Sequence, residues 1–360
     1  MGIAALERTG LTQCQSKAGS LHRRIQVCSW RRGHSIGRLF SIVFLLFSIR
    51  TVSAEPSHPS DQTTVIIVVG AAGEEEFGKE FERWAGLWAS ASDKAGARHL
   101  TIGLDKTNET SDLERLKQGL SAEVNDTTNE LWLVLLGHGT FDGKEAKFNL
   151  RGPDLSATDL ANWLRPFKRP LAIINSSGSS APFLNKLSAP GRVIITATRS
   201  GYEQNYARFG QYLSEAIAAP EADLDKDGQT SLLEAFLMAS RRVAEFYASE
   251  GRLVTEHALL DDNGDGLGTP AEWFRGIRPI KRAKDGAALD GLRAHQFHLI
   301  RSPQDQQLSP ALRARRNELE LAVINLRDKK DKLSEDDYYR QLEAVLVELA
   351  KVSGGDSAAR

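Results

Sequence analysis

The sequence predicts an α/β protein with a mainly parallel sheet flanked by helices. Short runs of apolar and β-branched residues alternate with longer stretches in which apolar residues recur at helical spacing. This alternation is typical of βαβ units, whose crossover helices cover the faces of a parallel sheet. The expected strands are Thr64–Val69, His99–Leu104, Leu131–Leu136, Leu171–Ile174 and Arg192–Thr198.

Helical segments are expected between these strands and after the last of them. Ser111 is a good candidate for the N-cap of one helix, because its hydroxyl can accept a hydrogen bond from a free backbone amide. The expected helices are Glu74–Ala91, Ser111–Val124, Thr158–Leu164 and Tyr206–Ala218.

The N-terminus resembles a targeting segment. An arginine-rich region is followed by the apolar run Leu39–Ile49, and Val52-Ser53-Ala54 then supplies a small-residue cleavage pattern. The apolar run is about half of the roughly 20 residues that a spanning helix needs. We therefore expect residues 1–54 to be a signal for export to the periplasm or beyond, with an uncleaved membrane anchor as the alternative. Residues 55–63 would then be a polar linker.

Composition excludes several classes of protein. The formal net charge is −1, and outside the N-terminus no basic stripe remains, so a nucleic-acid partner is not expected. Cys14 and Cys28, the two cysteines, both precede the first globular segment. The body of the protein therefore has neither a disulfide scaffold nor a cysteine nucleophile.

Two of the expected strands end in loops that carry reactive side chains. Leu131–Leu136 is followed by His138-Gly139, and Leu171–Ile174 is followed by Asn175-Ser176-Ser177-Gly178. In an open α/β sheet, adjacent loops converge beyond the carboxyl ends of parallel strands. A histidine after one strand and a hydroxyl after the next form the layout of a base–nucleophile pair.

Two acidic loops follow, and each fits the twelve-residue pattern of an EF-hand calcium loop. A hard cation needs six to eight oxygen ligands, and carboxylates at alternate loop positions can point inward together. The helix expected from Leu232 to about Glu250 would connect the two loops as in a paired hand, within residues 221–275. The candidate calcium ligands are Asp223, Asp225, Asp227, Gln229, Ser231 and Glu234 in the first loop, and Asp261, Asn263, Asp265, Leu267, Thr269 and Glu272 in the second.

The remainder is expected to be a connector, a helical hairpin and a tail. Residues 276–304 form the connector and include the apolar run Phe297–Ile300, which is a candidate edge strand. Residues 305–352 read as two helices, with Ser309-Pro310 and Ser334 at their starts. Such a hairpin is typical of packing or self-association surfaces. A disordered tail is expected at residues 353–360.

The arrangement of strand, His-Gly, helix, strand and nucleophile loop resembles clan CD cysteine peptidases, which include caspases, gingipains and legumain-like enzymes. The resemblance covers residues 64–220, and exported bacterial caspase-like proteins look closer still, through GHGTFDG, the segment Ile195–Gly201 and the following acidic region. It implies a caspase-like sheet, with calcium loops and a helical hairpin after it. It also implies that His138 is the base, that the amide of Gly139 belongs to an oxyanion site, and that Arg199 lies in the primary specificity pocket, where it would suit an acidic side chain. The alternative for Arg199 is a surface salt bridge.

The same resemblance places Ser177 where the family has its cysteine. A serine hydroxyl needs a well-aligned base, whereas a thiol ionises readily beside an imidazole. The sequence therefore predicts a calcium-binding peptidase homologue that binds peptides or proteins without cleaving them. One alternative is an active serine endopeptidase, with Ser177, or else Ser176 or Ser179, as the nucleophile. Another is a calcium-dependent structural protein. No Gly-x-Ser-x-Gly surrounds Ser177, which counts against an α/β-hydrolase.

Overall fold

The computed structural model describes residues 62–105, 109–281 and 288–354. The chain divides into two units, Met1–Ser53 and Ala54–Arg360, and all described residues belong to the second. The predicted export segment, residues 1–54, lies outside the described residues. None of the described helices is both long enough and apolar enough to cross a membrane.

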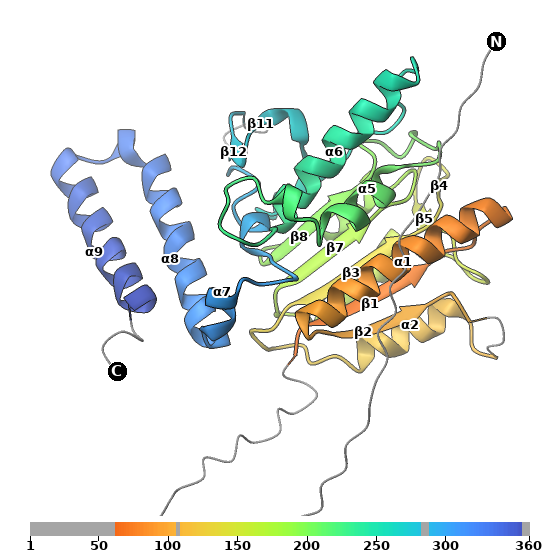
Figure 1. Ribbon diagram of the computed structural model, residues 1–360, viewed down its shortest axis with the longest axis horizontal. Helices are drawn as coiled ribbons and strands as arrows, with labels where there is room; N and C mark the ends of the chain where they lie inside the picture. Colours follow the sequence, from red (N-terminus) through yellow and green to blue (C-terminus); the bar gives the residue numbers. More distant parts are fainter. Residues whose placement is uncertain (1–61, 106–108, 282–287, 355–360) are drawn as a thin grey trace, which may run out of the picture. The chain divides into compact units, whose positions relative to one another are not determined.

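A seven-stranded sheet forms the centre of the fold, in the order β10-β9-β8-β7-β3-β1-β2 (Figure 1). The five strands predicted from the sequence are all present and pair in parallel, which confirms the predicted α/β class. Antiparallel pairing adds β9 and β10 at one edge. The strands are β1 (Thr64–Val69), β2 (Arg98–Ile102), β3 (Leu131–Leu136), β7 (Leu171–Asn175), β8 (Arg192–Thr196), β9 (Leu259–Asp261) and β10 (Thr269–Pro270).

Both faces of this sheet are buried, which explains why its central strands are apolar throughout. Every residue of β1 and β3 is buried, and alternate residues of β1 enter two separate apolar cores. Helices α1 (Glu75–Ala95), α5 (Phe209–Ala216) and α6 (Leu232–Ser249) contribute to one core. The other core receives side chains from α2 (Asp112–Ser121), α3 (Ala157–Leu164) and α4 (Ala181–Leu187). Ser111 caps α2 as predicted, since its hydroxyl accepts a hydrogen bond from the Glu114 amide.

A small antiparallel sheet, which the sequence pattern did not predict, begins directly after His138. Its strands are β4 (Gly139–Phe141), β5 (Ala146–Phe148) and β6 (Leu155–Ser156). Each is too short for a clear alternation of apolar and polar residues. A second small pair, β11 (Phe274–Arg275) and β12 (Arg278–Pro279), follows the second acidic loop.

Two expectations for the later part of the chain were wrong. Phe297–Ile300 is not a strand; it follows the 3-10 turn η4 (Ala294–Gln296) as irregular chain. Its apolar residues reflect burial instead, because Phe297 packs edge-on against Trp132 with 5.8 Å between ring centroids. The helix after the first acidic loop also does not reach the second loop. It ends at Ser249, and the second loop continues strand β9 of the central sheet.

The C-terminal hairpin is present as predicted. It comprises α8 (Pro310–Asp328) and α9 (Glu335–Gly354), which lie side by side in Figure 1 and are preceded by the short helix α7 (Pro303–Gln307). Ser309 caps α8, and Ser334 accepts a hydrogen bond from the Asp337 amide. Helix α9 extends two residues into the expected tail, and residues 355–360 lie outside the described residues.

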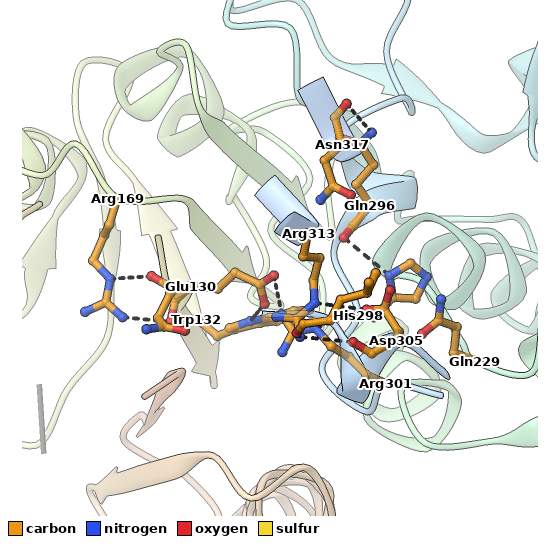
Figure 2. A network of polar contacts seen from close by, with 12 residues as sticks. Glu130, Trp132, Arg169, Gln229, Gln296, His298, Arg301, Asp305, Arg313 and Asn317 are labelled. Atoms are coloured by element: carbon orange, nitrogen blue, oxygen red, sulfur yellow. Dashed lines mark hydrogen bonds and ion pairs between the residues drawn. The ribbon is translucent and has the colours of Figure 1, made fainter. Parts of the chain in front are cut away.

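A polar network joins the start of β3 to the chain that leads into α8 (Figure 2). Arg301 pairs with Glu130 at 2.6 Å, and the indole of Trp132 donates to the other oxygen of Glu130. The buried carboxylate of Asp305 forms ion pairs with Arg301, Arg313 and Arg316. Partial neutralisation of each charge in this way makes its burial tolerable.

His298 is the titratable group of this network whose environment most disfavours its charged form. It is 5% exposed, its Nδ1 lies 3.3 Å from the Gln296 carbonyl, and its Nε2 has no partner among the described residues. Burial, assisted by His295, lowers the pKa of His298 to about 4. The imidazole is therefore neutral near pH 7.

We predict that acid destabilises the fold partly through His298. Because its folded-state pKa lies below the value of an unfolded chain, the unfolded state binds more protons as the pH falls from about 6.5 to about 4. The contribution of His298 to the free energy of unfolding is therefore complete above about pH 6.5. Roughly 3 kcal/mol of it is lost as the pH falls from about 6.5 to about 4. Urea unfolding at several pH values should therefore show a shallower pH dependence for His298→Gln than for the wild type. Equal slopes for the two proteins would contradict the prediction.

Candidate functional site

The two predicted loops lie next to each other because their strands are neighbours in the sheet. β3 pairs with β7 in register, with Leu135 opposite Asn175, so both strands end at the same edge. The loops are in close contact, since a Cβ placed on Gly139 would lie 2.6 Å from Ser177 Oγ and 2.3 Å from the carbonyl oxygen of Gly178. The structure thus brings Gly139 and Ser177 together, as the sequence predicts.

Ser177 is buried, and its hydroxyl makes a hydrogen bond within its own loop. Its Oγ donates a 2.7 Å hydrogen bond to Asn175 Oδ1, and its amide donates to the same oxygen at 3.1 Å. The residue is 0% exposed, with Gly139 packed over it. An amide oxygen is a very weak base, so this hydrogen bond does not activate the hydroxyl for attack.

His138 makes its hydrogen bond in a different direction. Its Nε2 lies 3.1 Å from the carbonyl oxygen of Ala72, which can only accept, so Nε2 carries the hydrogen and Nδ1 holds the lone pair. The imidazole is surrounded by Phe77, Phe81 and Tyr206, at 5.0, 5.1 and 6.0 Å between ring centroids. Burial lowers the pKa of His138, against smaller opposing effects of the Ala72 carbonyl and Glu74. Among the described residues, His138 makes no hydrogen bond with Ser177.

The alternative nucleophiles on the same loop are buried as well. Ser176 and Ser179 are each 1% exposed, and neither hydroxyl has a hydrogen-bond partner within the described chain. Ser179 adopts a left-handed backbone with φ of 56°, which costs energy for any residue with a Cβ. Ser180 bonds Thr198 across the end of β8 instead. A substrate carbonyl could reach any of these hydroxyls only if the loop moved.

Arg199, the predicted substrate-binding residue, is exposed but paired. Its Nε lies 3.3 Å from Glu203 Oε1, and its amide donates to the other oxygen of that carboxylate. The same carboxylate lies 2.6 Å from Nδ1 of His257. An acidic ligand would have to compete with Glu203 for Arg199. The ion pair is the alternative that the sequence left open for Arg199, whereas the contact of Glu203 with His257 could not be predicted, because these two residues are 54 positions apart.

The first acidic loop is held by hydrogen bonds from its own backbone amides to its carboxylates. The carboxylate of Asp223 accepts from the amides of Lys226 and Gly228, while Asp225 accepts from Asp227, and Asp227 from Gln229. Carboxylate oxygens of the three aspartates lie within 4.8 Å of one another.

Two further ligand candidates of this loop, Ser231 and Glu234, form the start of α6. Glu234 is 0% exposed, and it accepts from the amides of Leu224 and Asp225 with one oxygen and from Ser231 with the other. This donor set of hard oxygens fits calcium. His295 adds one nitrogen, since its Nε2 is 3.0 Å from Asp225, a contact that the loop pattern could not reveal.

The second acidic loop repeats the same internal hydrogen bonds within the β9–β10 connection. Asp261 accepts from Gly264 and Gly266, Asn263 accepts from Asp265, and Asp265 accepts from Leu267. The residues equivalent to Lys226 and Gly228 of the first loop are Gly264 and Gly266, and all four have positive φ.

The twelfth position of the second loop differs from that of the first. Glu272 is exposed on the turn η2 (Ala271–Trp273), and among the described residues it makes no hydrogen bond to the loop. Asp290 takes the equivalent place instead, because it accepts from the amide of Asp262 and from the hydroxyl of Thr269. Thr269, the predicted ligand at the ninth position, thus faces a carboxylate that lies outside the twelve-residue pattern.

Comparisons with known proteins give structural similarities alone. No protein-family model matches the chain, and no curated protein matches it. Similar solved structures include the Drosophila initiator caspase Dronc, with a TM-score of 0.39 and 13% identity, covering 59% of this chain and 83% of that chain. Caspase-1 from Spodoptera frugiperda is also similar, with a TM-score of 0.36 and 10% identity, covering 57% of this chain and 87% of that one. These scores and identities are too low to decide family or activity.

The close packing of Gly139 on the serine loop leads to a stability prediction. Gly139→Ala should lower the free energy of unfolding by about 1–3 kcal/mol, because its methyl group would overlap the Gly178 carbonyl oxygen and displace the backbone. Gly86→Ala is the matched control, since it lies within α1 with no atom near its Cβ position and should be neutral or stabilising. Urea unfolding of both variants checks this, and an unaffected Gly139→Ala would show that the two loops are not in contact.

Proposed function

We propose that this protein is an exported caspase-like peptidase homologue that binds peptides and calcium but does not cleave its ligand. The observation that carries the proposal is the state of Ser177. Its hydroxyl is buried, donates to Asn175 and lies beneath Gly139, while the imidazole of His138 is bonded to Ala72. A serine nucleophile needs the opposite arrangement, in which the hydroxyl donates to the imidazole.

The active-serine alternative requires a specific rearrangement. Ser177 Oγ would have to leave Asn175 and donate to Nδ1 of His138, the nitrogen that holds the lone pair. Attack on a peptide carbonyl would then pass the serine proton to the imidazole, and the amide of Gly139 would bond the oxyanion. A thiol would depend less on this alignment, because much of it can ionise beside an imidazole before attack.

Calcium binding is proposed for both acidic loops. Support comes from their shared pattern of backbone amides bonded to carboxylates, which directs carboxylate oxygens inward at alternate positions. In the first loop Glu234 supplies the twelfth position. In the second loop Asp290 has the equivalent contacts, so we propose it as a ligand there in place of Glu272.

A calcium-dependent interaction protein is the second candidate function. The outer face of α9 favours it, because Tyr339, Leu346 and Val347 are 51%, 44% and 48% exposed. With Leu342 and Ala350 these residues line an apolar groove along the helix. Exposed apolar surface of this kind is typical of self-association, here through the hairpin.

The peptidase part of the proposal is tested with the chain from Glu55 against a mixed peptide library. We expect the wild type to bind peptides without cleaving them. Ser177→Cys is expected to cleave once a bound peptide opens the loop, because a thiol can ionise beside an imidazole without a hydrogen bond aligned in advance. Adding His138→Ala to the cysteine variant should lower its rate by roughly 100-fold or more, which is the usual contribution of a general base. Mass spectrometry reports cleavage, and Ser177→Ala is the inactive control.

The other outcomes of this experiment decide between the candidates. Cleavage by the wild type that is lost in His138→Ala would overturn the proposal in favour of an active serine peptidase. If no variant binds or cleaves any peptide, peptide binding is wrong and the calcium-dependent interaction protein is favoured.

The calcium part is tested by titration calorimetry with matched variants. We expect the wild type to bind two calcium ions, and Asp227→Ala and Asp265→Ala each to remove one, because each deletes an oxygen ligand at the exposed fifth position of its loop. Calcium at about 100 times its dissociation constant should stabilise the fold by roughly 2.7 kcal/mol for each site. Asp290→Asn should weaken the second site, and Glu272→Gln should leave it unchanged. If Glu272→Gln weakens the second site and Asp290→Asn does not, Glu272 is the twelfth ligand after all. If no binding heat is measured for the wild type, the proposal of calcium at both loops is wrong.

A further inference from the structure

A cavity of about 390 Å³ lies between α6 and the chain that leads into β9. Its walls are mainly apolar and include Leu237, Val243 and Ala244 from α6 and Val254 from the facing segment. Pockets of this volume can enclose a large side chain or a small organic group. Leu253, beside Val254, is 88% exposed, which extends the apolar surface outside the cavity.

The charged groups around the cavity leave one carboxylate without a partner. Arg241 is paired with Glu245 at 2.7 Å, and His257 is paired with Glu203. Glu256 is buried, where it accepts hydrogen bonds from the first amides of α5 and from Tyr247. Glu272 also lines the cavity, is exposed, and has no cation partner within the described chain. The cavity therefore combines an apolar interior with a carboxylate that has no cation partner among the residues the structure describes.

We propose that this cavity binds a peptide segment in which a large apolar residue is followed by lysine or arginine. The apolar side chain would fill the space beside Leu237 and Val243, and the basic side chain would pair with Glu272. This inference rests on the proposed peptide-binding function and adds a specificity to it. It also gives Glu272 a role outside the second acidic loop.

A chain of hydrogen bonds connects this cavity to the loop of Ser177. The amide of Ser179 donates to the Glu203 carbonyl at 2.7 Å, and the Glu203 carboxylate bonds His257, which lines the cavity. Backbone atoms of Gln204 and Asn205 pack directly against Gly178. The cavity is therefore connected to the serine loop through Glu203 and His257.

The test is a ¹⁵N chemical-shift titration of the full-length chain with three blocked tetrapeptides. Gly-Phe-Lys-Gly is the probe, and Gly-Ala-Lys-Gly and Gly-Phe-Glu-Gly are its matched controls. Replacing phenylalanine should weaken binding roughly tenfold or more, because burial of the ring is lost. Replacing lysine by glutamate should weaken it roughly fivefold, as expected for one exposed ion pair.

Variants at exposed positions locate the bound peptide. Ala244→Trp should fill the cavity and abolish binding, whereas Ala248→Trp, one turn further along the same face of α6 but outside the cavity lining, should bind as the wild type does. Glu272→Gln should remove the preference for lysine over glutamate, and Glu82→Gln on α1 should retain it.

The contrary results test separately the cavity, the role of Glu272 and the peptide specificity. Equal binding by Ala244→Trp would place the peptide elsewhere and make the cavity assignment wrong, while peptide binding itself would stand. A retained lysine preference in Glu272→Gln would remove the role of Glu272. If the probe fails to bind while the mixed library binds, the specificity is wrong. If neither binds, the proposed function fails with it.

Discussion

The parallel pairing of β3 with β7 inside a sheet buried on both faces is the constraint on which the candidate site depends. With every residue of both strands buried, a one-residue shift of register would exchange side chains between the two cores and disrupt the packing of both. The register therefore fixes where each strand ends, and this brings the glycine after His138 onto Ser177. A side chain at position 139 would separate the loops, so the glycine and the buried serine depend on each other.

The sequence predicted those parts of the fold that local patterns determine. Five apolar runs became five parallel strands, and Ser111 and Ser309 cap the helices they were expected to cap. It did not predict β4 to β6, because strands of two or three residues have no readable period. The apolar run Phe297–Ile300 wrongly predicts a strand, because burial beside Trp132 and pairing in a sheet both select apolar residues.

For the site, the sequence predicted that the two loops lie together but not the hydrogen-bond partners of their side chains. Ser177 donates to Asn175 two residues away, and His138 bonds a carbonyl 66 residues earlier in the chain. Either hydrogen bond depends on side-chain rotamers that tertiary packing selects. The acidic loops show the same limit. Their internal hydrogen bonds are local and follow from the pattern, whereas the twelfth position depends on what comes next: helix α6 after the first loop, and the short strand β10 and the turn η2 after the second.

The surroundings of the acidic loops indicate what bound cations would do for this fold. In the first loop, Gln229 accepts from the amide of Ser302, which begins α7, and thus contacts the network that holds α8. In the second loop, the Asp262 carboxylate accepts from the amides of Gly291 and Ala294, and the Asp290 carboxylate accepts from the amide of Asp262. A cation in either loop would draw together carboxylates and segments that are distant in sequence. Such a cation would stabilise the connection between the central sheet and the C-terminal helices. Calcium would therefore act on the scaffold rather than in a chemical step, as expected for a protein whose serine loop is closed.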